Sequence, residues 1–280
     1  MIDLHLHTTA SDGFLSPAQL VARATAAGLT TISITDHDTV AAIAEVTELA
    51  GAVGIRAIPG IEITAVDDGR DVHMLGYFFD PGSATLAAVL ERQRALRVAR
   101  VREIGERLAA LRMPIDVESV LLTAAARPGS SVGRPQVARE LMRAGYVASV
   151  PEAFDLWLAT GRPAFIPRTG PSPAAAVGAI HEAGGIASMA HPGVTKRDEL
   201  IGPLIDAGLD AIEVYHSDHT PEAEHTYKMI AERHGVATSG GSDFHGDESR
   251  RNTLGLVSLP AEAFASLVSA FAKASADRKR

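Results

Sequence analysis

The sequence predicts an α/β protein in which repeated strand–helix units surround a parallel sheet and a helical lobe interrupts the repeat. Seven short runs rich in β-branched residues alternate with helix-like stretches, and this alternation stops between residues 77 and 186. The length of 280 residues suits one α/β barrel, which takes about 250 residues, together with an insertion. We therefore expect residues 1–80 and 165–280 to form the barrel and residues 81–164 to form the inserted lobe. The predicted strands are residues 2–6, 31–35, 56–59, 72–77, 186–189, 211–214 and 236–239.

The composition narrows both the class of protein and the kind of metal site. The chain has 46% apolar residues and a formal net charge of −8, which suits a globular protein and disfavours nonspecific nucleic-acid binding over the whole surface. It has no cysteine, so disulfides and thiolate ligands are excluded and His, Asp and Glu remain as ligands. The N-terminus lacks a signal-peptide pattern, and no run of about 18 apolar residues occurs. We expect a cytoplasmic protein with no membrane span and no obligate protein partner.

The first strand and the loop after it carry three potential ligands. His5 and His7 are two residues apart, and the alternation of a strand points both imidazoles to the same side. Asp12 follows in the loop, where an Asp on its own is usually a turn former. The first helix then begins at Ser16-Pro17-Ala18-Gln19, which combines an N-cap, a Pro in the first turn and a capping-box Gln, and it ends at Gly28.

The next three strands also supply polar groups, and barrel active sites are built where strands end. The second strand is followed by Thr35-Asp36-His37-Asp38, a polar run that is costly to bury unless it is paired or binds a cation, and we select His37 as the ligand. Glu62 follows the third strand, and its carboxylate can bridge two cations. His73 lies in the fourth strand, where a lone histidine is usually a hydrogen-bonded core residue, but the other candidate ligands favour a metal role.

A long helix is predicted over residues 83–112, followed by shorter helices. Between residues 90 and 112, seven arginines against three glutamates leave a local charge of +4 in an acidic protein. Two interpretations remain open, a solvated helical face and a basic cap over an anionic substrate. The arginines are Arg92, Arg94, Arg97, Arg100, Arg102, Arg107 and Arg112.

The last strands also end in polar residues. A proline directly after His191 restricts the backbone of that residue and presents its imidazole at the end of the fifth strand. After the seventh strand, two consecutive glycines allow close backbone approach before Asp243 and His245, which alternate onto one face. The loop after the sixth strand holds His219, which we consider as a phosphate donor or leaving-group acid.

These candidate ligands are more than one metal ion needs. A single ion usually takes three or four protein ligands, so their number implies two or three divalent metal ions at the barrel mouth. The nine candidates are His5, His7, Asp12, His37, Glu62, His73, His191, Asp243 and His245.

The motifs that carry these residues closely resemble the PHP (polymerase and histidinol phosphatase) family over nearly the whole chain. The resemblance implies a distorted (β/α)₇ barrel and a trinuclear metal site, and we expect manganese, with iron and zinc as alternatives. By this resemblance one ion would be held by His5, His7, Glu62 and Asp243, a second by Asp12, His37 and His245, and a third by Glu62, His73 and His191. The matching segments are Asp3-Leu4-His5-Leu6-His7-Thr8-Thr9-Ala10-Ser11-Asp12-Gly13, Thr35-Asp36-His37-Asp38, Gly60-Ile61-Glu62, Ala190-His191-Pro192 and Gly241-Ser242-Asp243-Phe244-His245.

Segments of the predicted lobe resemble one branch of this family, the 3′,5′-nucleoside bisphosphate phosphatases. These segments include Ser131-Val132-Gly133-Arg134-Pro135 and Gly161-Arg162-Pro163-Ala164. The resemblance implies substrates such as 3′-phosphoadenosine 5′-phosphate, and some members of this branch are also described as 5′-to-3′ exoribonucleases on short RNA. We assign Arg134 to the substrate phosphate, because a guanidinium fork matches phosphate oxygens, with a surface arginine at a helix start as the alternative.

The expected reaction is in-line attack on the phosphorus of a phosphate monoester by a hydroxide that bridges metal ions. Asp243 is expected to be essential for turnover, and the leaving-group acid is either His219 or a metal-bound water. Three alternatives remain open. They are a phosphatase acting on histidinol phosphate or another small molecule, a nuclease whose arginine-rich helix binds short single-stranded RNA, and a regulatory module that binds metals without catalysis.

Overall fold

A single seven-stranded sheet forms the centre of the molecule, and its spatial strand order equals the sequence order. The computed structural model describes residues 1–126, 129–246 and 253–278. The predicted α/β fold with a seven-stranded barrel is confirmed. Its strands are β1 (Ile2–Leu6), β2 (Thr31–Ile34), β3 (Arg56–Asp67), β4 (Arg70–Tyr77), β5 (Ile186–Met189), β6 (Ala211–His216) and β7 (Ala237–Gly241).

The barrel is nearly closed by contacts between β1 and the chain that follows β7. Leu6 and Phe244 form a parallel bridge, and the His7 backbone N–H donates to the Phe244 carbonyl at 3.0 Å. The glycine at the end of β7 makes this approach possible, since a Cβ on Gly241 would lie 2.3 Å from the His5 backbone nitrogen. The closure places the segment after β7 directly beside the two histidines of β1.

The expectation of a fully parallel sheet is wrong at β4, which runs antiparallel to both β3 and β5. The cause is a two-residue turn at Asp68 and Gly69, whose φ angles of 48° and 71° are those of a type I′ hairpin. An Asp-Gly pair between strands is a strong hairpin signal, so the reversal was readable from the sequence. As a result His73 lies near the start of β4 and still reaches the same end of the barrel as the ligands after β1, β2 and β7.

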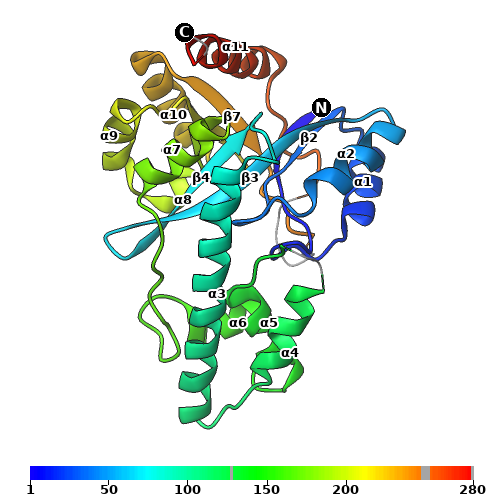
Figure 1. Cartoon of the computed structure of the whole chain (residues 1–280), viewed down its shortest axis with the longest axis vertical. Helices are drawn as coiled ribbons and strands as arrows, with labels where there is room; N and C mark the ends of the chain where they lie inside the picture. Colours follow the sequence, from blue (N-terminus) through cyan, green and yellow to red (C-terminus); the bar gives the residue numbers. More distant parts are fainter. Residues whose placement is uncertain (127–128, 247–252, 279–280) are drawn as a thin grey trace.

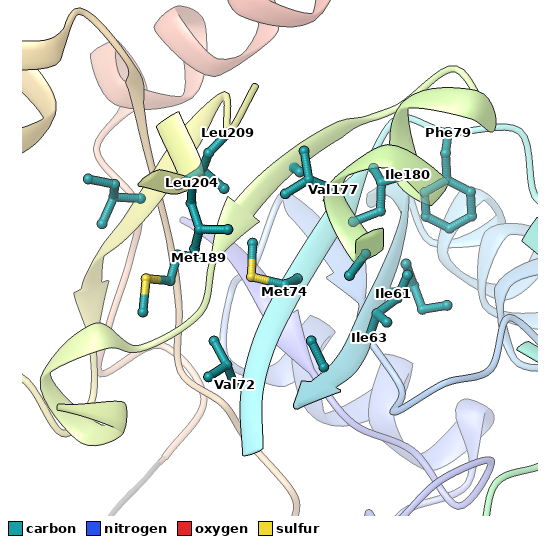
Figure 2. Packing of buried hydrophobic residues seen from close by; sticks show 14 of the residues in the cluster. Ile61, Ile63, Val72, Met74, Phe79, Val177, Ile180, Met189, Leu204 and Leu209 are labelled. Carbon is teal, nitrogen blue, oxygen red and sulfur yellow. The ribbon is translucent and has the colours of Figure 1, made fainter. Parts of the chain in front are cut away.

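Helices cover the outside of the barrel. The predicted first helix is confirmed, with both hydrogen bonds of the capping box between Ser16 and Gln19. Figure 2 shows Val177 and Ile180 gathered with residues of β3 and β4, which include Ile61 and Met74, in the larger core cluster. Around the barrel lie α1 (Pro17–Ala26), α2 (Ile43–Ala52), α7 (Pro173–Glu182), α8 (Pro192–Thr195), a 3₁₀ turn (Asp198–Leu200), α9 (Ile201–Asp206), α10 (Pro221–His234) and α11 (Ala261–Asp277).

The chain between β4 and α7 leaves the barrel and returns to it. The long helix expected over residues 83–112 is confirmed as α3 (Ala84–Ala110), and Figure 1 shows it running away from the sheet beside the shorter helices. Val101, Ile104 and Leu108 follow the helical period and belong to a separate hydrophobic cluster with residues of these helices. The shorter elements are α4 (Val117–Ala125), α5 (Arg134–Arg143), α6 (Val150–Ala153) and a π-helical turn (Phe154–Leu158). Among the helices that the structure describes, none combines the length and apolar character needed to cross a membrane.

Candidate metal centre and substrate cavity

The nine predicted metal ligands converge at the barrel mouth, and Glu62 lies at their centre. Glu62 is part of β3, which continues beyond its expected end at residue 59. Its two carboxylate oxygens lie between 2.7 and 3.3 Å from ring nitrogens of five predicted imidazoles. These imidazoles belong to His5, His7, His37, His73 and His191.

The remaining predicted ligands lie around His7. His245 Nε2 lies 3.3 Å from Asp12 Oδ1, and His37 Nε2 lies 3.8 Å from the other oxygen of Asp12. Asp243 Oδ1 lies 3.2 Å from His7 Nε2. Three sets of predicted residues therefore have donor atoms within 4.8 Å of one another. They are His5, His7, Glu62 and Asp243; His7, Asp12, His37 and His245; and His37, Glu62 and His73.

Several ring nitrogens in these sets fit divalent cations. Both nitrogens of His7 and the Nδ1 atoms of His37 and His73 are buried. Each lies within 4 Å of a carboxylate oxygen, but none makes a hydrogen bond of good geometry in the described part of the chain. Buried polar atoms are nearly always paired, so these nitrogens point to a missing partner of another kind. Imidazole and carboxylate donors together are the set that zinc, iron and manganese accept.

The carboxylates of the cluster are held in their ionised, metal-binding form. Burial by itself would raise the pKa of Glu62, but the neighbouring His37, His73 and His5 outweigh it and hold that pKa well below its usual range. Burial opposes ionisation of Asp12 in the same way, and His245 and His37 hold the pKa of Asp12 well below its ordinary value.

Three residues at the mouth have left-handed backbones that non-glycine residues rarely adopt. The φ angles are 52° at Asp38, 28° at His191 and 53° at Asp243. Such conformations persist only where surrounding contacts hold them, and they concentrate at functional sites.

The loop that carries Asp12 is held by a buried carboxylate that sequence reasoning did not select. Asp36 accepts hydrogen bonds from the backbone N–H of Thr8 at 2.7 Å and from the hydroxyls of Thr8 and Ser11, both at 2.6 Å. Burial raises the pKa of Asp36, and these donors oppose that rise. Asp36 therefore orders the segment that places Asp12 over the site.

A cavity of about 480 Å³ is lined by residues of the metal-ligand cluster and by residues of α3, α5 and the π-helical turn. One wall consists of predicted ligands, among them Asp12, Glu62 and Asp243. Phe154 and Val194 add apolar surface to the lining. A volume of this size accommodates a ligand as large as a nucleotide.

A second wall of the cavity is an arginine cluster formed by Arg97, Arg134 and Arg168, all of which belong to the lining. Arg97 Nε donates to Asp38 Oδ2 at 2.6 Å, and Asp71 lies 3.3 Å from Arg134 and 3.4 Å from Arg168. Three guanidinium groups face two carboxylates, so the wall keeps a net charge of +1.

Arg168 is the part of the arginine cluster with free hydrogen-bonding capacity. Its Nε and Nη1 atoms are buried without a hydrogen-bond partner among the described residues. Burial lowers the pKa of Arg168 to about 9, so the guanidinium remains charged at neutral pH. The predicted phosphate ligand Arg134 also lies on this wall, with its guanidinium 5.6 Å from the centre of the Phe154 ring.

The arginine-rich helix combines the two interpretations that the sequence left open. Of the seven arginines of this segment, six lie in α3, and Arg97 is the one found in the described lining of the cavity. Arg100 is buried and donates to the Ile166 carbonyl at 2.8 Å. Arg102 and Arg107 are exposed, and Arg102 pairs with Glu118 on the surface. The helix therefore supplies one arginine to the cavity. The other arginines described here are buried against the protein, as Arg100 is, or exposed to solvent, as Arg102 and Arg107 are.

His219, unlike the other predicted substrate ligand Arg134, is absent from the described lining of the cavity. Its Nδ1 lies 2.8 Å from the Val214 carbonyl, and its Nε2 accepts the backbone N–H of Gly193 at 3.2 Å. Both ring nitrogens are thus engaged, and the contact with Gly193 supports the turn that begins at His191.

Sequence reasoning missed Glu213 and His216, which form a further buried set with His5. A shift in the pairing of β6 with β7 between Glu213 and Tyr215 is the reason. Residues three apart in a regular strand point to opposite faces, but the irregularity brings Glu213 and His216 to the same side. The only signal in the sequence was an acidic residue inside an apolar strand.

Comparison with known proteins agrees with this geometry. The family model of the PHP domain matches residues 3–128. The chain is 37% identical to a 5′-3′ exoribonuclease of Haemophilus influenzae, over 87% of this chain and 89% of that protein. It is 34% identical to a 3′,5′-nucleoside bisphosphate phosphatase of Chromobacterium violaceum, over 87% of each chain. The crystal structure of a proposed metal-dependent phosphoesterase from Bifidobacterium adolescentis superposes with a TM-score of 0.88, at 33% identity over 96% of both chains.

Proposed function

This chain belongs to the PHP family of metal-dependent phosphoesterases, and we propose that it removes the 3′-phosphate from 3′,5′-nucleoside bisphosphates. One observation carries the proposal. The cavity is lined both by metal ligands and by an arginine cluster, so one substrate can present a phosphate to each. A bisphosphate uses both walls, whereas a monophosphate uses one.

The metal ions of the family would be held as the resemblance implies, one by His5, His7, Glu62 and Asp243, a second by Asp12, His37 and His245, and a third by Glu62, His73 and His191. When bound, they supply positive charge at the phosphorus and lower the pKa of water so that hydroxide forms near neutral pH. We propose manganese, with iron or zinc as alternatives, because imidazole and carboxylate donors suit all three. Asp243 contributes one of the carboxylates and is proposed to be essential for turnover.

The chain's own residues would bind the rest of the substrate. The forks of Arg134 and Arg168 can donate in pairs to the 5′-phosphate. Arg168 offers Nε and Nη1, which lie near Asp71 and Asp38 but make no hydrogen bond among the described residues. Phe154 and Val194 offer apolar surface to the base. We assign His219 to support of the His191 turn, because its Nε2 already accepts from Gly193 and is not free to protonate a leaving group.

A second candidate activity is stepwise removal of nucleotides from the 5′ end of short RNA. The relative from Haemophilus influenzae, which carries that name, supports it. The same two walls could hold the first two phosphates of a strand. This activity would depend strongly on salt concentration, since each phosphate contact releases counterions. Histidinol phosphate is disfavoured, because its ammonium group would face the arginine cluster.

The test compares four substrates after metal loading, by phosphate release for the three small molecules and by nucleotide release for the RNA, with metal content measured by mass spectrometry. They are 3′-phosphoadenosine 5′-phosphate, adenosine 3′-monophosphate, histidinol phosphate and a 5′-phosphorylated RNA oligomer. We expect two or three metal ions per chain and at least about tenfold higher kcat/KM for the bisphosphate than for the monophosphate, because the arginine cluster adds binding. Equal turnover of both nucleotides, or preference for histidinol phosphate, contradicts the proposal.

Two variants test the metal ligands and the arginine cluster independently of each other. Asp243→Asn should abolish turnover while the circular dichroism spectrum stays unchanged. Arg134→Lys keeps the charge and loses the fork, so KM for the bisphosphate should rise about tenfold while KM for adenosine 3′-monophosphate stays nearly constant. Arg102→Lys is the matched control, because Arg102 is exposed on the same inserted segment and absent from the described cavity lining.

A further inference from the structure

The buried carboxylate of Glu213 contacts two of the proposed metal ligands from behind. Glu213 lies on β6 and is fully buried. Its Oε1 accepts a hydrogen bond from His5 Nδ1 at 2.9 Å, and its Oε2 accepts the backbone N–H of His191 at 2.7 Å. A carboxylate is costly to bury unless it is paired, and here each oxygen is paired with a different ligand residue.

The contact with His5 determines which nitrogen faces the site. A proton on Nδ1 is donated to Glu213, so Nε2 carries the lone pair. That Nε2 lies 3.3 Å from Glu62 and 3.5 Å from Asp243, on the side of the metal-ligand cluster. An imidazole that donates its far nitrogen to a carboxylate is oriented and made a better ligand.

The contact with His191 holds a strained backbone. The φ angle of His191 is 28°, in a region that non-glycine residues rarely adopt. A charge-assisted hydrogen bond from its N–H to Glu213 offsets part of this cost and keeps the turn in place. The imidazole of His191 then reaches Glu62, with Nε2 at 3.1 Å from Oε1.

We propose that Glu213 is a positioning residue that fixes the tautomer of His5 and the backbone of His191, so that both imidazoles are ready to bind metal. This inference rests on the proposed function, because it requires that these histidines bind metal ions. Glu213 itself is absent from the described lining of the cavity and acts through the two histidines that it contacts.

The experiment measures Mn²⁺ affinity of the metal-free full chain by titration, together with its thermal unfolding. Glu213→Gln keeps the size of the side chain, but its amide NH₂ must face one of the two N–H donors. We expect Mn²⁺ affinity to fall about 10- to 100-fold, as is usual for partners that orient ligands. At saturating Mn²⁺ the kcat should recover toward that of the wild type. Glu213→Asp keeps the charge and should retain affinity between those of the Gln variant and the wild type.

Ser188→Ala is the matched control, because it removes a buried hydrogen bond of 2.8 Å to Ser239 inside the same barrel. It should lower the melting temperature of the metal-free protein and leave Mn²⁺ affinity unchanged. The proposal is overturned if Glu213→Gln behaves as this control does. If the Glu213→Gln variant does not fold, the proposal is instead overturned by a Glu213→Asp variant that binds Mn²⁺ as tightly as the wild type. A wild type that binds Mn²⁺ but hydrolyses none of the four substrates defeats the proposed function alone, and one that binds no metal defeats both.

Discussion

Three consecutive residues after β2 contact three different parts of the molecule. Asp36 holds the loop of Asp12, His37 joins the metal-ligand cluster, and Asp38 pairs with Arg97. The left-handed backbone at Asp38, with φ of 52°, turns the third side chain away from the first two. Asp38 also accepts the backbone N–H of Thr64 at 2.9 Å, and so links β3 to the arginine cluster.

Asp38→Asn tests this link at the level of one residue. Asn has the same shape and tolerates the left-handed backbone, so the substitution removes charge without adding strain. Arg97 then remains buried, and its partner at 2.6 Å no longer carries a negative charge. We expect the free energy of unfolding to fall by about 3 kcal/mol, at the lower end of the range for breaking a buried pair, because the amide oxygen can still accept. Urea denaturation measures the change.

The control is Glu118→Gln, which breaks the exposed pair between Arg102 and Glu118. Exposed ion pairs contribute little, so its effect should stay within about 0.5 kcal/mol. If Asp38→Asn lowers the free energy of unfolding by less than about 1 kcal/mol, Arg97 finds a new partner and Asp38 does not neutralise charge in the arginine cluster.

At the scale of elements, the hairpin of β3 and β4 is the feature that most shapes the site. The two strands pair along eight residues from Gly60 with Tyr77 to Asp67 with Arg70. The reversal brings Asp71 to the arginine cluster and His73 to the metal-ligand cluster. One short turn therefore supplies a group to each wall of the cavity.

The hairpin also shows what sequence reasoning could and could not achieve. The strands, the long helix and the convergence of nine ligands were predictable, because periodicity and strand-end motifs are local signals. The direction of β4 was missed although Asp68-Gly69 is a local turn signal. Glu213 and Arg168 could not be selected, because their importance arises from a strand irregularity and from packing between segments far apart in sequence. Local patterns do not encode such pairings.

Gly69→Ala tests the turn. Gly69 has φ of 71°, and a Cβ there would meet no atom within 4 Å, so the substitution measures backbone strain alone. We expect a loss of about 1 kcal/mol in the free energy of unfolding. The same substitution at Gly51, inside α2 and equally unobstructed but without a positive φ, should stabilise the protein by about 0.5–1 kcal/mol. Urea denaturation of both variants measures whether each substitution raises or lowers the free energy of unfolding. A change in the same direction in both variants would contradict the assigned turn.

At the scale of the whole molecule, the proposed metal centre joins the two ends of the barrel. His5 lies in β1 and His7 directly follows it, whereas Asp243 and His245 follow β7. The seam between these segments is the place where the barrel closes. Each ion held between them would add a cross-link that the unfolded chain cannot form. Metal binding should therefore stabilise the closed barrel as well as support catalysis.

Removal of metal should lower the melting temperature of the intact chain by about 5–10 °C. A metal present at about one hundred times its dissociation constant adds about 2.7 kcal/mol, and a protein of this size shifts by about 2–4 °C per kcal/mol. Calorimetry before and after chelation, and again after Mn²⁺ is restored, measures the shift. Asp243→Asn should show a smaller shift, because it removes a carboxylate from the seam, whereas Arg102→Lys should show the full one. An unchanged melting temperature after verified metal removal would mean that the ions bind to a barrel already closed by its backbone hydrogen bonds, and the cross-linking role would be wrong.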